Sequence, residues 1–149
     1  MAGIVVPGRK ALTAEGAEDR RGIEMDINQV SGTIVDAAMK VHTALGPGLL
    51  QSAYNACLAH ELRTRGLRVD LQVPVPVVYD GVKLEVGYRI DMLVERSVVV
   101  ELKAITKLLP VHEAQLLSHL RLNDNRLGLL INFHVLHLRD GIKRIANHL

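Results

Sequence analysis

Two runs of alternating apolar residues, joined by an Asp-Gly pair, limit the folds that this chain can adopt more than any other feature of its sequence. An apolar side chain occupies every second position from Leu67 to Tyr79 and again from Val82 to Val94. This period of two is typical of strands with one buried face, and Asp-Gly is typical of a two-residue hairpin turn. Pro74 and Pro76 have no backbone N–H to donate, so the first strand is predicted at the edge of a sheet. We therefore expect an antiparallel hairpin of two long strands.

A third strand and a crossover are predicted next. Residues 95–97 can form a short loop into a third strand over residues 98–105. Residues 127–133 are apolar almost throughout, which is typical of a strand covered on both faces. A helix that starts at Pro110 and ends near Asn123 lies between these strands, and such a connection is right-handed and parallel by default. The sheet is therefore predicted to be mixed.

Two helices are predicted before the strands. Apolar residues recur at steps of three and four from Ile27 to Leu45, with Asp26 in the N-cap position. The Gly-Pro-Gly segment 46–48 ends this helix, and a second helix is expected from Leu49 to Gly66. After the buried strand, residues 136–145 predict either a short hairpin or a strand with a helical turn.

These elements predict an α/β (α+β) fold in which helices flank a mixed sheet. The 149 residues suffice for one core, and residues 25–149 are expected to form a single domain, preceded by a flexible leader over residues 1–24. The one cysteine, Cys57, cannot form an internal disulfide, and the sequence contains no apolar run long enough for a membrane span, so a cytoplasmic location is expected. A net charge of +2 is compatible with a polyanionic partner but does not require one.

The second and third strands bring acidic residues together. If residues 95–97 form a three-residue loop, Val94 faces Val98, and Asp91 then lies opposite Glu101. Opposed side chains in an antiparallel pair have Cβ atoms about 4.5–5.5 Å apart, so two carboxylates could share one metal ion. Lys103 lies diagonal to Asp91 and could orient or deprotonate an attacking water. Mg²⁺ or Mn²⁺ is the expected ion, because such ions accept one or two carboxylates together with waters and phosphate oxygens.

A simpler interpretation of the same residues also exists. An acid and a lysine that face each other across a hairpin usually form a solvated ion pair, and the pattern D…ExK arises often by chance. The aliphatic residues Leu93, Val99 and Ile105 share this face, which favours a partly covered cleft over open solvent. From spacing alone, both interpretations stay open.

Longer motifs add specificity. Over residues 26–147 the chain resembles the bacterial GxxExxY proteins, which are assigned to the PD-(D/E)XK nuclease superfamily. The segments that carry the resemblance are AAMKVHTALGPGLLQSAY, LRTRGLRVDLQVPVPVVYDGVKL, GYRIDMLVERSVVVELKAI, PVHEAQLLSHLRL, LGLLINF and DGIKRIAN. It implies a restriction-endonuclease-like core of helix, antiparallel meander, crossing helix and further strand. It also implies that Asp91, Glu101, Lys103, Gln51 and Gln115 form the site.

The chain departs from the family at two of its motifs. The segment from Gly48 to Tyr54 reads G-x-x-Q-x-x-Y, so the acid of the family is replaced by Gln51. An amide oxygen can still contact an ion or a metal-bound water, but the lost negative charge should weaken divalent-ion binding. His119 stands where relatives show a tyrosine, one helical turn from Gln115. It could contact phosphate, although a half-buried histidine with an ordinary hydrogen bond is the favoured interpretation.

The resemblance leads us to expect a metal-dependent nuclease that hydrolyses phosphodiester bonds in nucleic acid, with DNA as the first candidate. Arg63, Lys107 and Arg121 are expected to contact the phosphate backbone. The alternative is a non-catalytic nuclease-fold module that binds nucleic acid or a protein. A homodimer formed through the edge strand with Pro74 and Pro76 is a further expectation, although prolines discourage strand addition.

Overall fold

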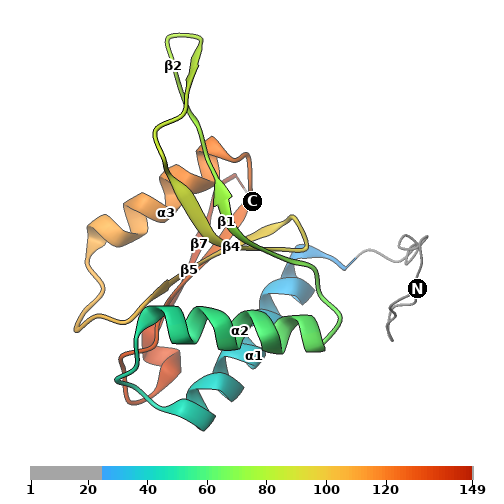
Figure 1. Cartoon of the computed structure of the whole chain (residues 1–149), viewed down its shortest axis with the longest axis vertical. Helices are drawn as coiled ribbons and strands as arrows, with labels where there is room; N and C mark the ends of the chain where they lie inside the picture. The colour runs from blue at the N-terminus through green and yellow to red at the C-terminus, as the bar shows by residue number, and fades with distance from the viewer. Residues whose placement is uncertain (1–24, 149) are drawn as a thin grey trace.

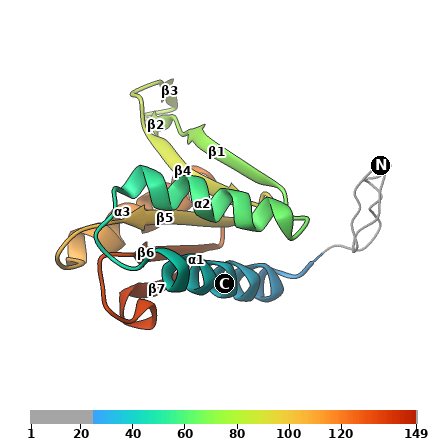
Figure 2. The same ribbon diagram turned by 60° about the horizontal axis from the view of Figure 1, so that its bottom comes forward.

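The computed structural model describes residues 25–148, so the leader predicted over residues 1–24 lies outside the described residues. A five-stranded sheet in the order β1-β4-β5-β6-β7 forms the centre, with α1 and α2 on one face and α3 on the other (Figure 1, Figure 2). The mixed α/β fold predicted from the sequence is confirmed. The elements are α1 Ile27–Leu45, α2 Gln51–Thr64, β1 Val69–Pro74, β2 Val77–Tyr79, β3 Val82–Leu84, β4 Arg89–Val94, β5 Val98–Lys103, α3 Pro110–Leu122, β6 Leu127–Asn132, the 3₁₀ helix η1 Leu138–Gly141 and β7 Ile142–Ala146.

The first helix begins where the sequence predicts. Asp26 is its N-cap, and the Asp26 carboxylate accepts hydrogen bonds from the backbone N–H groups of Asn28 and Gln29 at 2.8 and 3.0 Å. Gln29 Oε1 in turn accepts from Asp26 N at 3.0 Å, which completes a capping box. These bonds satisfy N–H groups that have no partner within the helix.

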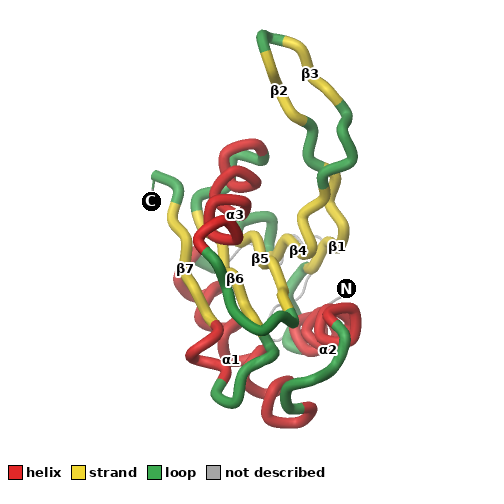
Figure 3. Tube along the Cα trace, turned by 90° about the vertical axis from the view of Figure 1, so that its left-hand side faces the viewer, coloured by secondary structure: helices red, strands yellow, loops and turns green. Residues whose placement is uncertain are grey.

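Each of the two long strands predicted from the sequence is interrupted in the structure, which corrects that prediction. The first long strand divides into β1 and β2, and the second divides into β3 and β4. Pro74 and Pro76 interrupt the first strand because they cannot donate to a ladder, and Gly87, with φ +84°, lies in the break in the second. As a result, β2 and β3 form a separate two-stranded sheet that extends away from the body (Figure 3). β1 is an edge strand, as predicted.

The crossover is confirmed as well. β5 and β6 pair in parallel and are connected through α3, while β6 is buried along its whole length. At the end of the described chain, η1 and β7 give the strand with a helical turn that was one of the two predicted alternatives. No helix among the described residues is long and apolar enough to span a membrane.

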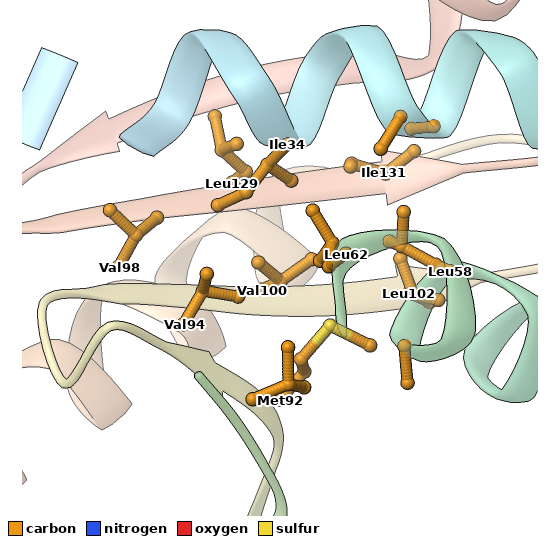
Figure 4. Packing of buried hydrophobic residues seen from close by; sticks show 14 of the residues in the cluster. Ile34, Leu58, Leu62, Met92, Val94, Val98, Val100, Leu102, Leu129 and Ile131 are labelled. Carbon is orange, nitrogen blue, oxygen red and sulfur yellow. The ribbon is translucent and has the colours of Figure 1, made fainter. Parts of the chain in front are cut away.

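Each face of the sheet has its own apolar cluster. Figure 4 shows the larger one, in which Ile34 of α1 and Leu58 and Leu62 of α2 pack on the strands. The strand residues of this cluster include Met92, Val94, Val98, Val100, Leu102, Leu129 and Ile131. The smaller cluster lies under α3 and contains Val75, Ile90, Leu93, Val99, Leu116, Leu120 and Leu130.

The cluster memberships correct one detail of the predicted faces. Strict alternation along β4 would place Ile90 on the same face as Met92, and Met92 lies with Val100 and Leu102 in the larger cluster. Ile90 is buried but belongs to the cluster under α3. The pairing of β4 with β5 ends at Met92 and Val100, so Ile90 lies beyond the part of β4 that follows β5.

Close contact between α3 and β6 depends on a glycine. A Cβ atom added at Gly128 would lie 2.9 Å from Leu116 Cδ1, which is too close for a real side chain. The missing side chain lets Leu116 lie directly on the strand. This contact sets the distance between α3 and the sheet face that carries the predicted site.

Candidate active site

The loop between β4 and β5 sets the register of the predicted acids. Glu95 and Arg96 both have positive φ angles, 53° and 54°, and Ser97 N donates to Val94 O at 3.0 Å. Val94 pairs with Val98, as the sequence predicts for a three-residue loop. The pairing ends at Met92 and Val100, so Asp91 is the first residue of β4 beyond it and does not form the predicted ladder pair with Glu101. The two acids still lie near each other, because the charge of Glu101 raises the pKa of Asp91.

Asp91 lies where the β4–β5 pairing stops. Its Oδ2 accepts a hydrogen bond from Leu102 N at 3.0 Å, so the carboxylate occupies a position that a strand carbonyl would otherwise fill. Burial raises the pKa of the Asp91 carboxyl, the negative charge of Glu101 raises it further, and the Leu102 N–H and the Lys103 charge oppose this shift. A cation between the two acids would relieve this unfavourable charge.

Glu101 is buried, with 8% of its surface exposed, and contacts α3. Its Oε2 lies 3.1 Å from His119 Nδ1. The hydrogen bond to Glu101 raises the pKa of His119, and the charges of Glu101 and Asp91 add to this effect. The imidazole therefore holds a proton more readily than a free imidazole does. The half-buried histidine with a hydrogen bond, favoured by the sequence, is confirmed, and its partner is a predicted site residue.

The end of β6 fixes the backbone at and after Lys103. Asn132, which is 2% exposed, lies opposite Lys103 in the parallel pairing. The Asn132 side chain accepts from Ile105 N at 3.1 Å and donates to Ile105 O at 2.8 Å, while Phe133 N donates to Lys103 O at 2.9 Å. The half-buried Lys103 side chain lies on the same face of β5 as Glu101, and its charge lowers the pKa of Asp91.

The segment from Gly48 to Tyr54 brings Gln51 to the same place. The Tyr54 hydroxyl donates to Gly46 O at 2.5 Å and accepts from Leu49 N at 3.1 Å, and its ring stacks on Phe133 with centroids 4.5 Å apart. Tyr54 therefore holds the Gly-Pro-Gly loop against the end of β6. Gln51 is the first residue of α2, and its Nε2 lies 3.5 Å from Asp91 Oδ2. The motif combines a structural tyrosine with a side chain directed to the site.

The other predicted residues lie farther from these contacts. Gln115 is exposed on α3 and its side chain makes no hydrogen bond to any described residue, although it precedes His119 by one turn. Lys107 and Arg121 are also exposed. Arg63 Nη2 donates to Val69 O at 2.7 Å, so part of its bonding capacity holds α2 to β1. Of the five predicted site residues, the structure brings Asp91, Glu101, Lys103 and Gln51 together.

A comparison with family models gives a match to the PD-(D/E)XK nuclease superfamily over residues 28–145, which includes every one of these side chains. The chain belongs to the PD-(D/E)XK nuclease superfamily. The match is to the superfamily and does not single out the GxxExxY proteins. Neither the curated proteins nor the solved structures contain a match to this chain.

The sequence does not reveal two residues that support the candidate site. For His119, the usable signal is its position one helical turn from Gln115. For Asn132, the signal is an amide inside the apolar run of residues 127–133, because a buried amide needs hydrogen-bond partners. His119 bonds to Glu101, and Asn132 bonds to the backbone of Ile105, two residues after Lys103.

The oxygen donors of the candidate site fit a hard divalent cation better than a soft one. Within residues 25–148, no three His, Cys, Asp or Glu side chains gather as a ready metal cluster. Two carboxylates and an amide are too few for a closed zinc site, but Mg²⁺ commonly takes one or two carboxylates and completes its shell with water and phosphate oxygens. The raised pKa of Asp91 beside Glu101 is the observation that supports this fit.

Proposed function

We propose that this protein is a metal-dependent nuclease that hydrolyses nucleic-acid phosphodiester bonds. The observation that carries the proposal is the proximity of Asp91 and Glu101, with Lys103 near Asp91 and His119 bonded to Glu101. The superfamily match over residues 28–145 supports it. Within the superfamily, the motifs quoted above favour membership of the GxxExxY group.

Asp91 and Glu101 are the proposed ligands for Mg²⁺ or Mn²⁺, with the Gln51 amide at the margin of the shell. Such an ion, when bound, would polarise the scissile phosphate and lower the pKa of a coordinated water. Lys103 is the proposed group that orients the attacking water or stabilises charge on the phosphate. His119, in its protonated form, adds a positive charge on the α3 side that can attract a phosphate oxygen.

The proposed substrate is DNA, bound through its backbone. Lys107 and Arg121 are exposed cations that can contact phosphates, whereas Arg63 is partly engaged with Val69. Gln115, exposed on α3, is proposed to reach the site only when substrate is bound. Aromatic residues make up 3% of the chain, so stacking on bases would contribute little.

The domain and its compartment are proposed on separate grounds. Residues 25–149 are proposed to form one domain, because the two apolar clusters share the same five strands. A cytoplasmic location is proposed because Cys57 is a free thiol that packs against the larger cluster.

The test is cleavage of plasmid and single-stranded DNA in the presence of Mn²⁺. Lys103→Ala should slow cleavage by about 10²–10⁴-fold, as expected for a group that assists proton transfer. Lys143→Ala is the matched control, because this exposed lysine lies in β7 and should leave the rate unchanged. Equal rates for wild type and Lys103→Ala would contradict the catalytic role.

The replacement of an acid by Gln51 favours a second candidate, a non-catalytic module that binds nucleic acid or protein. The two candidates differ in their response to Gln51→Glu, which restores the acid expected from the resemblance. A nuclease limited by weak metal binding should gain activity at low Mn²⁺ concentration. A module without catalytic function should show no cleavage with or without this substitution.

A further inference from the structure

The β2–β3 hairpin presents apolar side chains to solvent, although at its base the Tyr88 ring lies beside His119, with ring centroids 6.0 Å apart. Figure 1 and Figure 3 show it extending beyond the five-stranded sheet. Tyr79, Val82, Leu84 and Val86 are 73%, 54%, 42% and 54% exposed. An isolated two-stranded hairpin is at best marginally stable in water, and an exposed apolar edge is a place where another strand can add. This arm therefore lacks a partner within the described chain.

Both strands of the arm have an open edge, because among the described residues β2 and β3 pair only with each other. Pro76 directly precedes β2 and has no N–H to offer an added strand, so the edge of β3 is the better suited of the two. The turn has two residues, Asp80 and Gly81, with φ angles of 54° and 74°. Tyr79 and Val82 close this turn and exchange backbone hydrogen bonds, so the backbone groups of Val82 and Leu84 face β2. The N–H and C=O groups of Lys83, and of Glu85 if the strand continues, are then directed away from β2.

Residues 82–86 read Val-Lys-Leu-Glu-Val, a sequence that complements itself when two copies run antiparallel. With Leu84 on the two-fold axis, Lys83 lies opposite Glu85 of the second copy, and Val82 lies opposite Val86. Each such pair forms twice in a symmetric interface. We infer that this protein forms a homodimer by antiparallel pairing of β3 with β3 of a second copy, centred on Leu84.

Charge selects this register over its neighbours. The two β3 strands can form hydrogen bonds only if residues whose backbone groups are directed away from β2 lie opposite each other. The two-fold axis must therefore pass through a residue and not between two residues. An axis at residue 83 places Lys83 opposite itself, and an axis at residue 85 places Glu85 opposite itself. Like charges directly opposite each other destabilise a sheet, whereas opposite charges stabilise it. The register centred on Leu84 is therefore the favoured one.

The charge of the arm favours a second copy over nucleic acid. Residues 77–89 carry two acids, Asp80 and Glu85, and two bases, Lys83 and Arg89, so the arm has no net charge. Binding to phosphate backbone depends on an excess of cations. Apolar side chains and balanced charge instead suit a protein edge of the same composition.

Sedimentation velocity from micromolar to millimolar protein tests the inference. Wild type should associate reversibly to a dimer. Lys83→Glu and Glu85→Lys each turn both cross-strand pairs into like-charge pairs and should weaken self-association by about tenfold. A mixture of the two variants should recover the wild-type affinity as a heterodimer, because its pairs are again opposite in charge. Both residues are exposed, so thermal unfolding should confirm that each variant remains folded.

Disulfide formation gives a second, structural readout. In a Cys57→Ser background, Leu84→Cys places two thiols on the axis, where Cα atoms of a non-hydrogen-bonded pair lie about 4.5 Å apart, within the range of a disulfide. Mild oxidation should link Leu84→Cys chains, and Tyr79→Cys on β2 should link poorly. A wild-type monomer at all concentrations, self-association that ignores both charge changes, or arm variants that alter only nucleic-acid binding would each overturn the inference.

Discussion

Alternate residues of β4 and β5 face opposite sides of one sheet, and the two sides hold different side chains. Under α1 and α2, the strand residues Met92, Val100 and Leu102 are apolar and fully buried. Under α3, the same strands present Leu93 and Val99, but also Glu101, which lies 3.1 Å from His119 and near Asp91. The first face is a continuous aliphatic layer, and the second combines a small apolar cluster with ionisable groups.

The two faces therefore have different roles: the first contributes mainly to stability, and the second carries the ionisable side chains. The apolar face can be close-packed because none of its strand residues needs water or a charged partner. Near the other face, burial and the charge of Glu101 raise the pKa of Asp91, so the ionised form of this carboxyl is less stable here than in water. We therefore expect substitutions on the first face to change mainly stability, and substitutions on the second to change mainly binding and pH dependence.

The largest effect on stability is expected from a cavity on the apolar face. Leu102→Ala should lower the free energy of unfolding by about 2–5 kcal/mol, because it removes buried contacts and leaves a void. Urea unfolding measures this change. The control Leu136→Ala removes a side chain that is 82% exposed and should cost less than about 0.5 kcal/mol. Similar small effects from both substitutions would mean that the apolar face is not the main source of stability.

A smaller effect is expected where α3 packs on β6. Gly128→Ala adds a methyl group against Leu116, which must shift, and should cost about 1–3 kcal/mol. Gly32→Ala is a control of opposite sign, because a Cβ at Gly32 meets nothing within 4 Å and alanine favours the helix. The two unfolding curves should therefore move in opposite directions. A stabilised Gly128→Ala variant would show that the contact between α3 and the sheet is loose.

On the site face, removing a charge should improve stability slightly. The pKa of Asp91 is raised in the folded state, so its contribution to stability is present below its unfolded pKa and is lost as pH rises through the folded pKa. At neutral pH and without divalent ions, Asp91→Asn should therefore raise the thermal unfolding midpoint. Asp140→Asn, at an exposed position, should leave it unchanged. A clear loss of stability in Asp91→Asn would assign Asp91 a structural role.

The smallest effect concerns pH. The hydrogen bond to Glu101 raises the pKa of His119 in the folded state above its usual 6.5. The stability that protonated His119 contributes is therefore fully present below about pH 6.5 and is lost as pH rises through the folded-state pKa. Without metal, the unfolding midpoint of wild type should fall from about pH 6 to about pH 8, and His119→Gln should reduce this fall. His60→Gln, exposed on α2, should retain it. Parallel profiles for wild type and His119→Gln would contradict the ion pair.

Local patterns explain which parts of the fold were predictable. The capping residue Asp26, the proline that begins α3 and the apolar run of β6 each act through their own neighbours, so the sequence reveals them. The division of the long strands was not predicted, because unbroken alternation continues through Pro74, Pro76 and Gly87. Alternation reports which face a residue occupies, and it contains no information about where one sheet ends and another begins.

The candidate site also contains some features that local sequence predicts and others that it does not. The pairing of Met92 with Val100, next to Asp91 and Glu101, follows from the loop of residues 95–97, which is local to the hairpin. The contact between His119 and Glu101 depends instead on how α3 crosses the sheet, and the Asn132 bonds to Ile105 depend on the parallel neighbour. Both are tertiary contacts, which periodicity does not specify.

Calorimetric titration with Mn²⁺ tests the central claim most directly, because it measures ion binding by Asp91 and Glu101 without any substrate. Wild type should bind the ion, Asp91→Asn should bind it at least about tenfold more weakly while remaining folded, and Gln51→Glu should bind it more tightly. Absence of binding at millimolar Mn²⁺, or equal binding by wild type and Asp91→Asn, would contradict the account.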